Sequence, residues 1–346
     1  MFTGAFLRRF LSTQQGMRAA VLSEFGGPEK ILIEHAHTRP TAVLDSQILI
    51  KVACSGVNPV DTYVRAGVYP ILPNLPYIVG RDGSGIVEEI GKHVHNVKKG
   101  DRVWVTNMGN GTAADYCVVE KAGLLPDGVT FEEGTCIGIP YLTAYTALFH
   151  NGSADARGEK RKKRLLVHGA SGAVGLAAIQ LAAAHPQTFD IVVGTAGSEE
   201  GVKFVQENGG NHCVNHRKDG YIQELKDKFK GFDLVLEMNA HLNLNKSIDL
   251  LSMNGRVVVI GSRGQIDFDP RSLMKKDASV IGCGLSNSLE GTFKEYSAAI
   301  THFFANTKFR PRIAQVYELE DVSKAHAAVT AGGPTNGQVV VRVAKL

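Results

Sequence analysis

A glycine-rich turn is the sharpest chemical motif in the chain. The segment Leu165–Gly175 reads LLVHGASGAVG, with an apolar stretch before Gly169 and a run of small, helix-forming residues after Gly172. A glycine in such a strand-to-helix turn lets the backbone approach a pyrophosphate, and the helix start offers free N–H groups and a positive dipole end. Glycines at 169, 172 and 175 are a variant of the dinucleotide-binding pattern. The alternative is a tight turn without a ligand.

The strand expected after this turn ends at Thr195 and Ala196, which are small and neutral. Enzymes that use NAD usually carry an acid here, which accepts a hydrogen bond from the ribose 2′-hydroxyl. Without that acid a 2′-phosphate is not repelled, so we expect NADPH to be preferred over NADH. The donors available nearby are Ser198, Lys203 and His216.

Four polar side chains gather early in the chain, at Asn58, Asp61, Tyr63 and Tyr69. The amide of Asn58 and the two phenols could donate hydrogen bonds to a carbonyl oxygen that becomes negative during a reaction. We expect Asp61 to orient its neighbours rather than to act as an acid. The alternative for each residue is a role in shaping the loop.

The pattern of elements predicts an α/β fold with two parts. Residues 17–145 are rich in β-branched residues and glycine, with strands expected at Ile48–Ala53, Gly85–Ile90 and Arg102–Val105. Strands and helices then alternate. The expected strands are Arg164–His168, Asp190–Thr195, Cys213–Asn215, Phe232–Glu237, Arg256–Ile260 and Val280–Cys283, and the expected helices are Val174–Ala184, Glu200–Asn208, Tyr221–Phe229 and Asn245–Leu251. This alternation is typical of a parallel, doubly wound sheet.

Composition is that of a globular protein. The 346 residues are 44% hydrophobic and 21% charged, which excludes a disordered or collagen-like chain. At roughly 150 residues per domain, two domains are expected. Apolar runs are too short for a transmembrane helix, so no membrane partner is expected. The five cysteines are scattered, which argues against a disulfide scaffold or a zinc knot.

Two local features account for the net charge of +4. Residues 1–16 hold Arg8 and Arg9, no acid, and five apolar side chains on one half of a helical wheel. This pattern is typical of a mitochondrial presequence, with cleavage after Leu11 and import into the matrix. The alternative is a cytoplasmic protein that starts at Met17.

The second feature is the basic run of residues 160–164, KRKKR. We interpret it as a solvated loop, and the alternatives are a nuclear signal or a contact with RNA.

From Met17 to about Leu346 the chain resembles the zinc-free, zeta-crystallin-like quinone reductases of the medium-chain dehydrogenase/reductase superfamily. The stretches that carry the resemblance are Arg18–Glu29, Ser55–Tyr63, Ile137–Tyr145, Val167–Ala177, Gly194–Gly201, Asn215–Arg217 and Gly261–Gly264. The resemblance implies a GroES-like β-rich domain with an inserted Rossmann domain. The expected division is a targeting segment at 1–16, a catalytic domain at 17–140, an NADP-binding domain at 141–286, and a return to the catalytic domain at 287–346.

The resemblance also implies the cofactor site. Tyr63 corresponds to the family's nicotinamide-side tyrosine, and the loop that holds Asn58, Asp61 and Tyr69 lies beside the nicotinamide in the family. The remaining carried-over contacts are Ser171, Gly172, Ala173, Val174, Gly197, His216, Asn243, Val259, Ile260, Gly261, Ser262, Cys283, Gly284 and Leu285.

Two departures weaken the expected NADPH preference. Gly201 stands where some relatives carry a lysine for the 2′-phosphate, and Gly337-Gln338 replaces a glycine–lysine pair.

Zinc relatives in the superfamily hold their metal with a cysteine after a Gly-Val pair and a histidine in a Gly-His-Glu motif. Here Asn58 follows Gly56-Val57, and Arg81 follows Gly80. Neither an amide nor a guanidinium replaces a thiolate or an imidazole as a zinc ligand, so we expect no metal. Alcohol oxidation without a Lewis acid is disfavoured, whereas a quinone is already electron-poor.

The leading hypothesis is therefore NADPH-dependent reduction of a small-molecule quinone, by single-electron or hydride steps. A second hypothesis is reduction of the double bond of an enal or enoyl thioester, with Tyr69 as a candidate proton donor. A third is binding of AU-rich RNA or a structural, crystallin-like role. The resemblance also implies a homo-oligomer, either a dimer or a tetramer.

Overall fold

The computed structural model describes residues 16–40, 43–106, 111–152, 162–332 and 336–346. The predicted targeting segment lies outside the described residues, apart from Gly16. Within them, no helix is long and apolar enough to cross a membrane. The chain forms two compact units: unit 1 comprises residues 1–124, 316–331 and 340–346, and unit 2 comprises residues 125–315 and 332–339.

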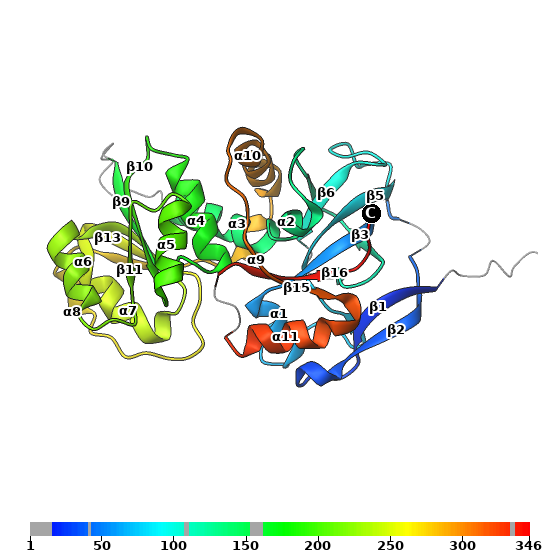
Figure 1. The fold of residues 1–346 in the computed structure, drawn as a ribbon, viewed down its shortest axis with the longest axis horizontal. Helices are drawn as coiled ribbons and strands as arrows, with labels where there is room; N and C mark the ends of the chain where they lie inside the picture. Colours follow the sequence, from blue (N-terminus) through cyan, green and yellow to red (C-terminus); the bar gives the residue numbers. More distant parts are fainter. Residues whose placement is uncertain (1–15, 41–42, 107–110, 153–161, 333–335) are drawn as a thin grey trace, which may run out of the picture. The chain divides into compact units, whose positions relative to one another are not determined.

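Unit 1 is built mainly from antiparallel strands (Figure 1). Its three-stranded sheet has the order β2-β1-β4, and a larger sheet has the order β15-β16-β3-β5-β6-β8, with β7 paired to β3. The strands are β1 (Gly16–Leu22), β2 (Ile31–Thr38), β3 (Ile48–Val57), β4 (Tyr77–Ile78), β5 (Asp82–Ile90), β6 (Arg102–Thr106), β7 (Tyr116–Val119), β8 (Ala122–Leu124), β15 (Ile313–Glu318) and β16 (Gln338–Arg342). The helical segments are η1 (Pro28–Lys30), α1 (Pro59–Arg65), η3 (Leu319–Asp321) and α11 (Val322–Thr330).

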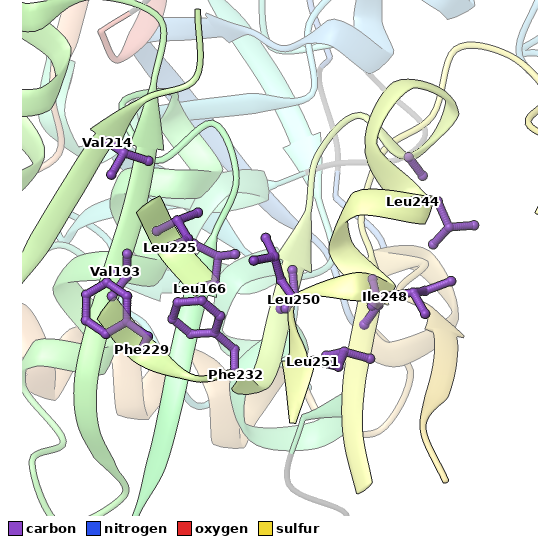
Figure 2. Packing of buried hydrophobic residues seen from close by; sticks show 13 residues of the cluster. Leu166, Val193, Val214, Leu225, Phe229, Phe232, Leu244, Ile248, Leu250 and Leu251 are labelled. Carbon is purple, nitrogen blue, oxygen red and sulfur yellow. The ribbon is translucent and has the colours of Figure 1, made fainter. Parts of the chain in front are cut away.

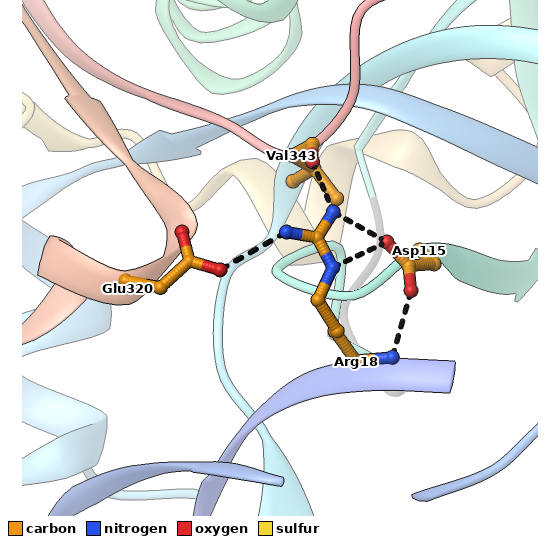
Figure 3. A network of polar contacts seen from close by, with 4 residues as sticks. All are labelled: Arg18, Asp115, Glu320 and Val343. Carbon is orange, nitrogen blue, oxygen red and sulfur yellow. Dashed lines mark hydrogen bonds and ion pairs between the residues drawn. The ribbon is translucent and has the colours of Figure 1, made fainter. Parts of the chain in front are cut away.

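Arg18 joins segments of unit 1 that are distant in sequence. Figure 3 shows its guanidinium between Asp115, Glu320 and the carbonyl oxygen of Val343. Nη2 donates to Asp115 Oδ1 at 2.9 Å and to Val343 O at 2.6 Å, and Nη1 donates to Glu320 Oε1 at 3.0 Å. The planar fork of an arginine can satisfy several acceptors at once. Strand β1 is thereby tied to the C-terminal segments that complete this unit.

Unit 2 contains a six-stranded parallel sheet with the order β11-β10-β9-β12-β13-β14. Numbered within the sheet, this is the 3-2-1-4-5-6 order of a Rossmann fold. Its strands are β9 (Lys163–Val167), β10 (Phe189–Ala196), β11 (His212–Asn215), β12 (Phe232–Glu237), β13 (Leu251–Val259) and β14 (Ser279–Gly282). Its helices are α2 (Phe131–Thr135), α3 (Gly138–Tyr145), the π-helical turn η2 (Thr146–Asn151), α4 (Ala173–Ala183), α5 (Glu199–Glu207), α6 (Tyr221–Phe229), α7 (Ala240–Asp249), α8 (Arg271–Met274), α9 (Leu285–Leu289) and α10 (Phe293–Asn306).

One apolar cluster binds helices α6 and α7 to this sheet (Figure 2). Leu166 and Val193 project from the central strands, Phe232 from β12, and Phe229 and Ile248 from the helices, and all are buried. The rings of Phe229 and Phe232 lie 5.4 Å apart, a favourable aromatic spacing. Burial of each such side chain stabilises the fold by about 1.5–3 kcal/mol. This packing holds the strands in register and so fixes where they end.

The expected α/β class and parallel sheet are confirmed. Helix α6 and strand β12 have the predicted bounds, whereas α7 begins at Ala240 rather than Asn245, and β15 was not predicted. The compact units also divide the chain at other points than 140 and 286. Helix α3 packs on α4, with Tyr141 donating from its hydroxyl to Gln180, and Tyr141 contacts Phe304 of α10. These contacts bring residues 125–140 and 287–315 into unit 2.

Candidate functional site

The glycine turn joins β9 to α4, as the sequence indicates, and β10 holds it in place. Gly169 has a φ of 62°, a left-handed conformation that favours glycine. Its N–H donates to Thr195 Oγ1 at 3.2 Å, and the N–H of Ala170 donates to the carbonyl oxygen of Thr195 at 2.8 Å. Gly172 is the N-cap of α4 and has extended backbone geometry. The shape of the turn therefore depends on the end of the neighbouring strand.

The glycines at 172 and 175 have different roles. A Cβ atom on Gly175 would lie 2.3 Å from the carbonyl oxygen of Gly169, so close packing requires glycine there. A Cβ atom on Gly172 would meet only that same oxygen, at 3.4 Å. The space at Gly172 lies at the N-terminus of α4, whose first turn carries no acid. This open, electropositive helix start fits a phosphate group.

A buried network supports the turn from below. His168 Nδ1 lies 3.4 Å from Thr195 Oγ1, and His168 Nε2 lies 3.8 Å from the Glu237 carboxylate. Glu237 also accepts from Ser247 Oγ at 2.6 Å. Burial lowers the pKa of His168, so the imidazole is neutral at pH 7. The ring of His168 therefore lies between the Thr195 hydroxyl and the Glu237 carboxylate.

The residues assigned to the cofactor by resemblance meet at one edge of unit 2. The phosphate turn follows β9, Gly197 follows β10, and His216 follows β11. Carboxyl ends of parallel strands share an edge, which is where doubly wound folds bind ligands.

The other carried-over segments reach the same edge. Ile260 N donates to Glu237 O at 2.9 Å, and Cys283 N donates to Val259 O at 2.8 Å. A Cβ atom on Gly261 would lie 2.4 Å from Met238 O, so the chains pack tightly here. Asn243 lies on α7, whereas Ser262, Gly284 and Leu285 lie just beyond β13 and β14. Burial raises the pKa of the Cys283 thiol to about 11, which keeps it protonated.

The segment just before β16 lies against this edge as well. Gly337 N donates to Ser171 O at 3.1 Å, and Gly337 bridges to Gly172. Asn336 Nδ2 donates to Glu200 at 3.5 Å, and Asn336 Oδ1 would lie 3.4 Å from a Cβ on Gly201. The departure at Gly337-Gln338 therefore lies beside the phosphate turn, and Asn336 of the same segment approaches Gly201, the other departure.

The polar residues of unit 1 centre on α1. Asn58 is the N-cap of this helix, only 3% exposed, and its N–H donates to Asp61 Oδ2 at 2.7 Å. Its amide Nδ2 donates to Asp82 Oδ2 at 2.9 Å. Because the amide is buried and donates to a carboxylate, the structure favours the alternative for Asn58, a role in shaping the loop. Sequence analysis missed Asp82, which lies 24 residues further along the chain.

Asp61 is a buried acid, 1% exposed, which sits close to Arg81. Burial raises the pKa of Asp61 to about 6, and Arg81, whose Nε lies 3.8 Å from Oδ1, acts in the opposite direction. The guanidinium of Arg81 also lies 5.3 Å from the centre of the Tyr69 ring. Asp61 therefore connects through Arg81 to Tyr69, in keeping with an orienting role.

Tyr63 and Tyr69 are both half-buried, the first on α1 and the second in the segment after it. Of the four predicted polar residues, these two keep partly accessible side chains. A tyrosine hydroxyl group can donate a hydrogen bond to a carbonyl oxygen.

The positions of the family's zinc ligands are occupied by groups with other roles. Asn58 caps a helix and Arg81 pairs with Asp61. Cys54 is buried in β3, in agreement with its expected packing role. Within the described part of the chain, no three His, Cys, Asp or Glu side chains gather in a way that could hold a metal ion. The expected absence of metal stays a prediction.

The basic run is only partly described, since Lys160 and Arg161 lie outside the described residues. Lys163 Nζ donates to Gly152 O at 2.7 Å, and Arg164 Nη1 donates to Phe229 O at 2.6 Å. Arg164 also pairs with Asp233 at 3.8 Å. These contacts engage two of the five cations in the fold, which does not favour a contact with RNA.

Fold and site together define a medium-chain dehydrogenase/reductase. Residues 44–141 match the alcohol dehydrogenase GroES-like domain family, and residues 173–303 match the zinc-binding dehydrogenase family. The chain is 42% identical to quinone oxidoreductase from Homo sapiens over 332 residues, which cover 95% of this chain and 98% of that protein. The protein therefore belongs to the quinone oxidoreductase, or zeta-crystallin-like, family of this class.

Two further relatives are more distant. The synaptic vesicle membrane protein VAT-1 homolog of Rattus norvegicus is 31% identical, with coverage of 89% of this chain and 80% of that protein. The Escherichia coli quinone oxidoreductase, solved in complex with NADPH, superposes with a TM-score of 0.81 at 25% identity, covering 94% of this chain and 100% of that one.

The buried state of Asp61 predicts a pH dependence of stability. The folded chain keeps this proton up to a pH of about 6, whereas the ordinary value is 3.8, so folding binds a proton between these values. The free energy of unfolding should therefore fall as pH rises from about 4 to 6, by roughly 3 kcal/mol from this residue. In Asp61→Asn that decrease should be absent. Urea unfolding at a series of pH values measures it.

Asp45→Asn serves as the control, because Asp45 is an exposed carboxylate paired with Lys92. It should keep the pH dependence of the unaltered protein. Equal pH slopes in Asp61→Asn and Asp45→Asn would show that Asp61 is ionised throughout this range.

Proposed function

We propose that this protein reduces quinones with electrons from NADPH. The observation that carries the proposal is the carboxyl edge of the sheet in unit 2, where an open helix start at Gly172 and the carried-over residues come together. The identity to quinone oxidoreductases and the likeness to an NADPH complex support the same activity.

The residues of unit 2 fit the dinucleotide. Ser171, Gly172, Ala173 and Val174 would hold the pyrophosphate on the N-terminus of α4. Gly197 and His216 would hold the adenosine, and the segments after β13 and β14 would complete the site. When bound, the nicotinamide supplies the reducing electrons. The contribution of the chain is to bind and orient it.

The residues of unit 1 suit a carbonyl substrate. In our proposal Tyr63 and Tyr69 donate hydrogen bonds to a quinone oxygen, where negative charge develops on reduction. Arg81 positions Tyr69, and Asp61 holds Arg81. Asn58 supports α1 as its cap and takes no direct part. The Asn58 amide and the Arg81 guanidinium are poor ligands for a metal ion that would act as a Lewis acid. An electron-poor quinone, which needs less activation, therefore suits the site better as a substrate than an alcohol does.

The edge of the sheet in unit 2 supports the expected homo-oligomer. Strand β14 is the last strand in the sheet order, and the apolar side chains of Met253, Met274 and Ile281 are exposed. Among the described strands β14 pairs only with β13, and an edge strand near exposed apolar residues can be covered by a second copy. We therefore propose at least a dimer, and a monomeric mass in light scattering would contradict it.

The activity is tested by turnover of the purified protein with NADPH across 1,2-naphthoquinone, a 2-enal and a primary alcohol. We expect the quinone to be reduced fastest and the alcohol not to be oxidised with NADP⁺. Treatment with a chelator followed by desalting should leave the rate unchanged. A faster rate with the enal would favour the double-bond reductase, and loss of activity on chelation would show that a metal takes part.

The phosphate turn is tested by Gly172→Asp. A Cβ fits at this position, so the variant should fold, but its carboxylate would occupy the phosphate space with like charge. NADPH affinity should fall by about a hundredfold or more. Gly172→Ala is the uncharged comparison and should have a smaller effect. Fluorescence titration measures binding, and unchanged affinity in Gly172→Asp would place the pyrophosphate elsewhere.

We also propose mitochondrial import, directed by residues 1–16. The support is the acid-free amphipathic pattern with Arg8 and Arg9. A reporter fused to these residues should reach the matrix, and Arg8→Glu with Arg9→Glu should block import. A cytosolic location of the unaltered fusion would favour Met17 as the working start.

A further inference from the structure

At the end of β10, two basic side chains pack against Gly197. A Cβ atom on Gly197 would lie 3.3 Å from His216 Nε2 and 3.3 Å from Arg217 Nε. Ala196, the preceding residue, is fully buried, and its Cβ faces Gly201. Gly197 is therefore the position from which a side chain would contact the two basic groups. An acidic side chain here would be the ribose acceptor of an NAD enzyme, and with glycine the two basic groups have no such acid beside them.

The donors expected from sequence do not provide a positive charge here. Partial burial and the nearby cations Arg217 and Lys246 lower the pKa of His216, which disfavours a positive charge on its imidazole. Ser198 Oγ accepts from Gly201 N at 3.1 Å as the N-cap of α5. Lys203 is 79% exposed and pairs with Glu207 at 3.7 Å.

Two cations that sequence analysis did not select remain. Arg217 follows His216, and its own N–H donates to Asn215 Oδ1 at 3.0 Å, which fixes the backbone at this point. Lys246 lies on α7, with Nζ 5.8 Å from the centre of the Tyr221 ring. No carboxylate among the residues that the structure describes forms an ion pair with either side chain. The next cation, Lys218, is different, because it pairs with Glu199 at 3.0 Å.

We propose that Arg217 binds the 2′-phosphate of NADPH beside Gly197. This inference rests on the proposed function, since it concerns the cofactor of that reaction. Arg217 presents a permanent charge and a planar donor fork to a phosphate. Arg217 replaces the lysines that relatives carry at the positions of Gly201 and Gln338, so this chain reads the phosphate from the β11 side of the site.

Neutralisation of single cations tests the assignment on the full-length protein. Arg217→Gln should raise the Kd of NADPH by about tenfold or more while the Kd of NADH changes little. Lys246→Gln, which removes a charge from α7, should change the Kd of NADPH less than Arg217→Gln does. Lys218→Gln is the matched control, because it removes the same charge one residue away, and it should leave both affinities unchanged. Circular dichroism confirms that the exposed substitutions leave the fold intact.

Adenosine 2′,5′-bisphosphate and 5′-AMP provide a measurement that involves no nicotinamide. Arg217→Gln should weaken binding of the bisphosphate selectively. Equal losses for NADPH and NADH, or the same effect in Lys218→Gln, would overturn the assignment. Quinone turnover with NADPH and NADH at equal efficiency would overturn this inference alone. A protein that binds neither dinucleotide would overturn the proposed function as well.

A converse variant places the acid where NAD enzymes have one. Gly197→Asp brings a carboxylate within reach of Arg217, so it should repel the 2′-phosphate and accept from the ribose 2′-hydroxyl. NADPH affinity should fall and NADH affinity should rise, which reverses the preference. An unchanged ratio of the two affinities in Gly197→Asp would show that the 2′ position lies elsewhere.

Discussion

Two hydrogen bonds from the glycine turn to Thr195 determine much of the geometry of unit 2. They tie the turn after β9 to the end of β10, so the N-terminus of α4 points to the edge where β10 and β11 end. Thr195 can take this role because its hydroxyl is buried and oriented by the neutral His168. The network continues to Glu237 at the end of β12. Three strand ends thus share one polar network beneath the turn, and any change in it would move the phosphate-binding backbone.

Unit 1 contains two buried carboxylates near its candidate site. Asp61 and Asp82 are both buried, and they are partnered by the Asn58 amide and by Arg81. Burial disfavours the ionised form of Asp61 more than the nearby Arg81 favours it, as its raised pKa indicates. In the zinc relatives of the superfamily the positions of Asn58 and Arg81 hold metal ligands. Here the same positions hold a helix cap and a guanidinium, which pair with Asp82 and Asp61.

The fold was largely predictable because unit 2 has strong periodic signals. Helix α6 and strand β12 have clear apolar patterns and matched their predicted bounds. The first turn of α7, with His241 and Asn243, lacks such a pattern, and β15 has an exposed, mixed face. The glycine turn was recognisable from local spacing alone. The contact of Asn58 with Asp82 was not, because it joins residues on a helix cap and a separate strand, and nothing in either segment specifies the partner.

The position of Arg217 follows from the register of two parallel strands. Strands β10 and β11 are parallel, with Ala196 opposite Asn215, so the residues that follow each strand must lie side by side. Gly197 therefore faces His216 and Arg217 as a consequence of register. Because Arg217 is exposed, its attraction for a phosphate is screened over a Debye length of about 8 Å at physiological salt. The helix-terminal contribution at Gly172 acts at contact distance and is screened less. If the proposed assignment holds, cofactor affinity rests on the turn, whereas discrimination at the 2′ position rests on Arg217 and weakens with ionic strength.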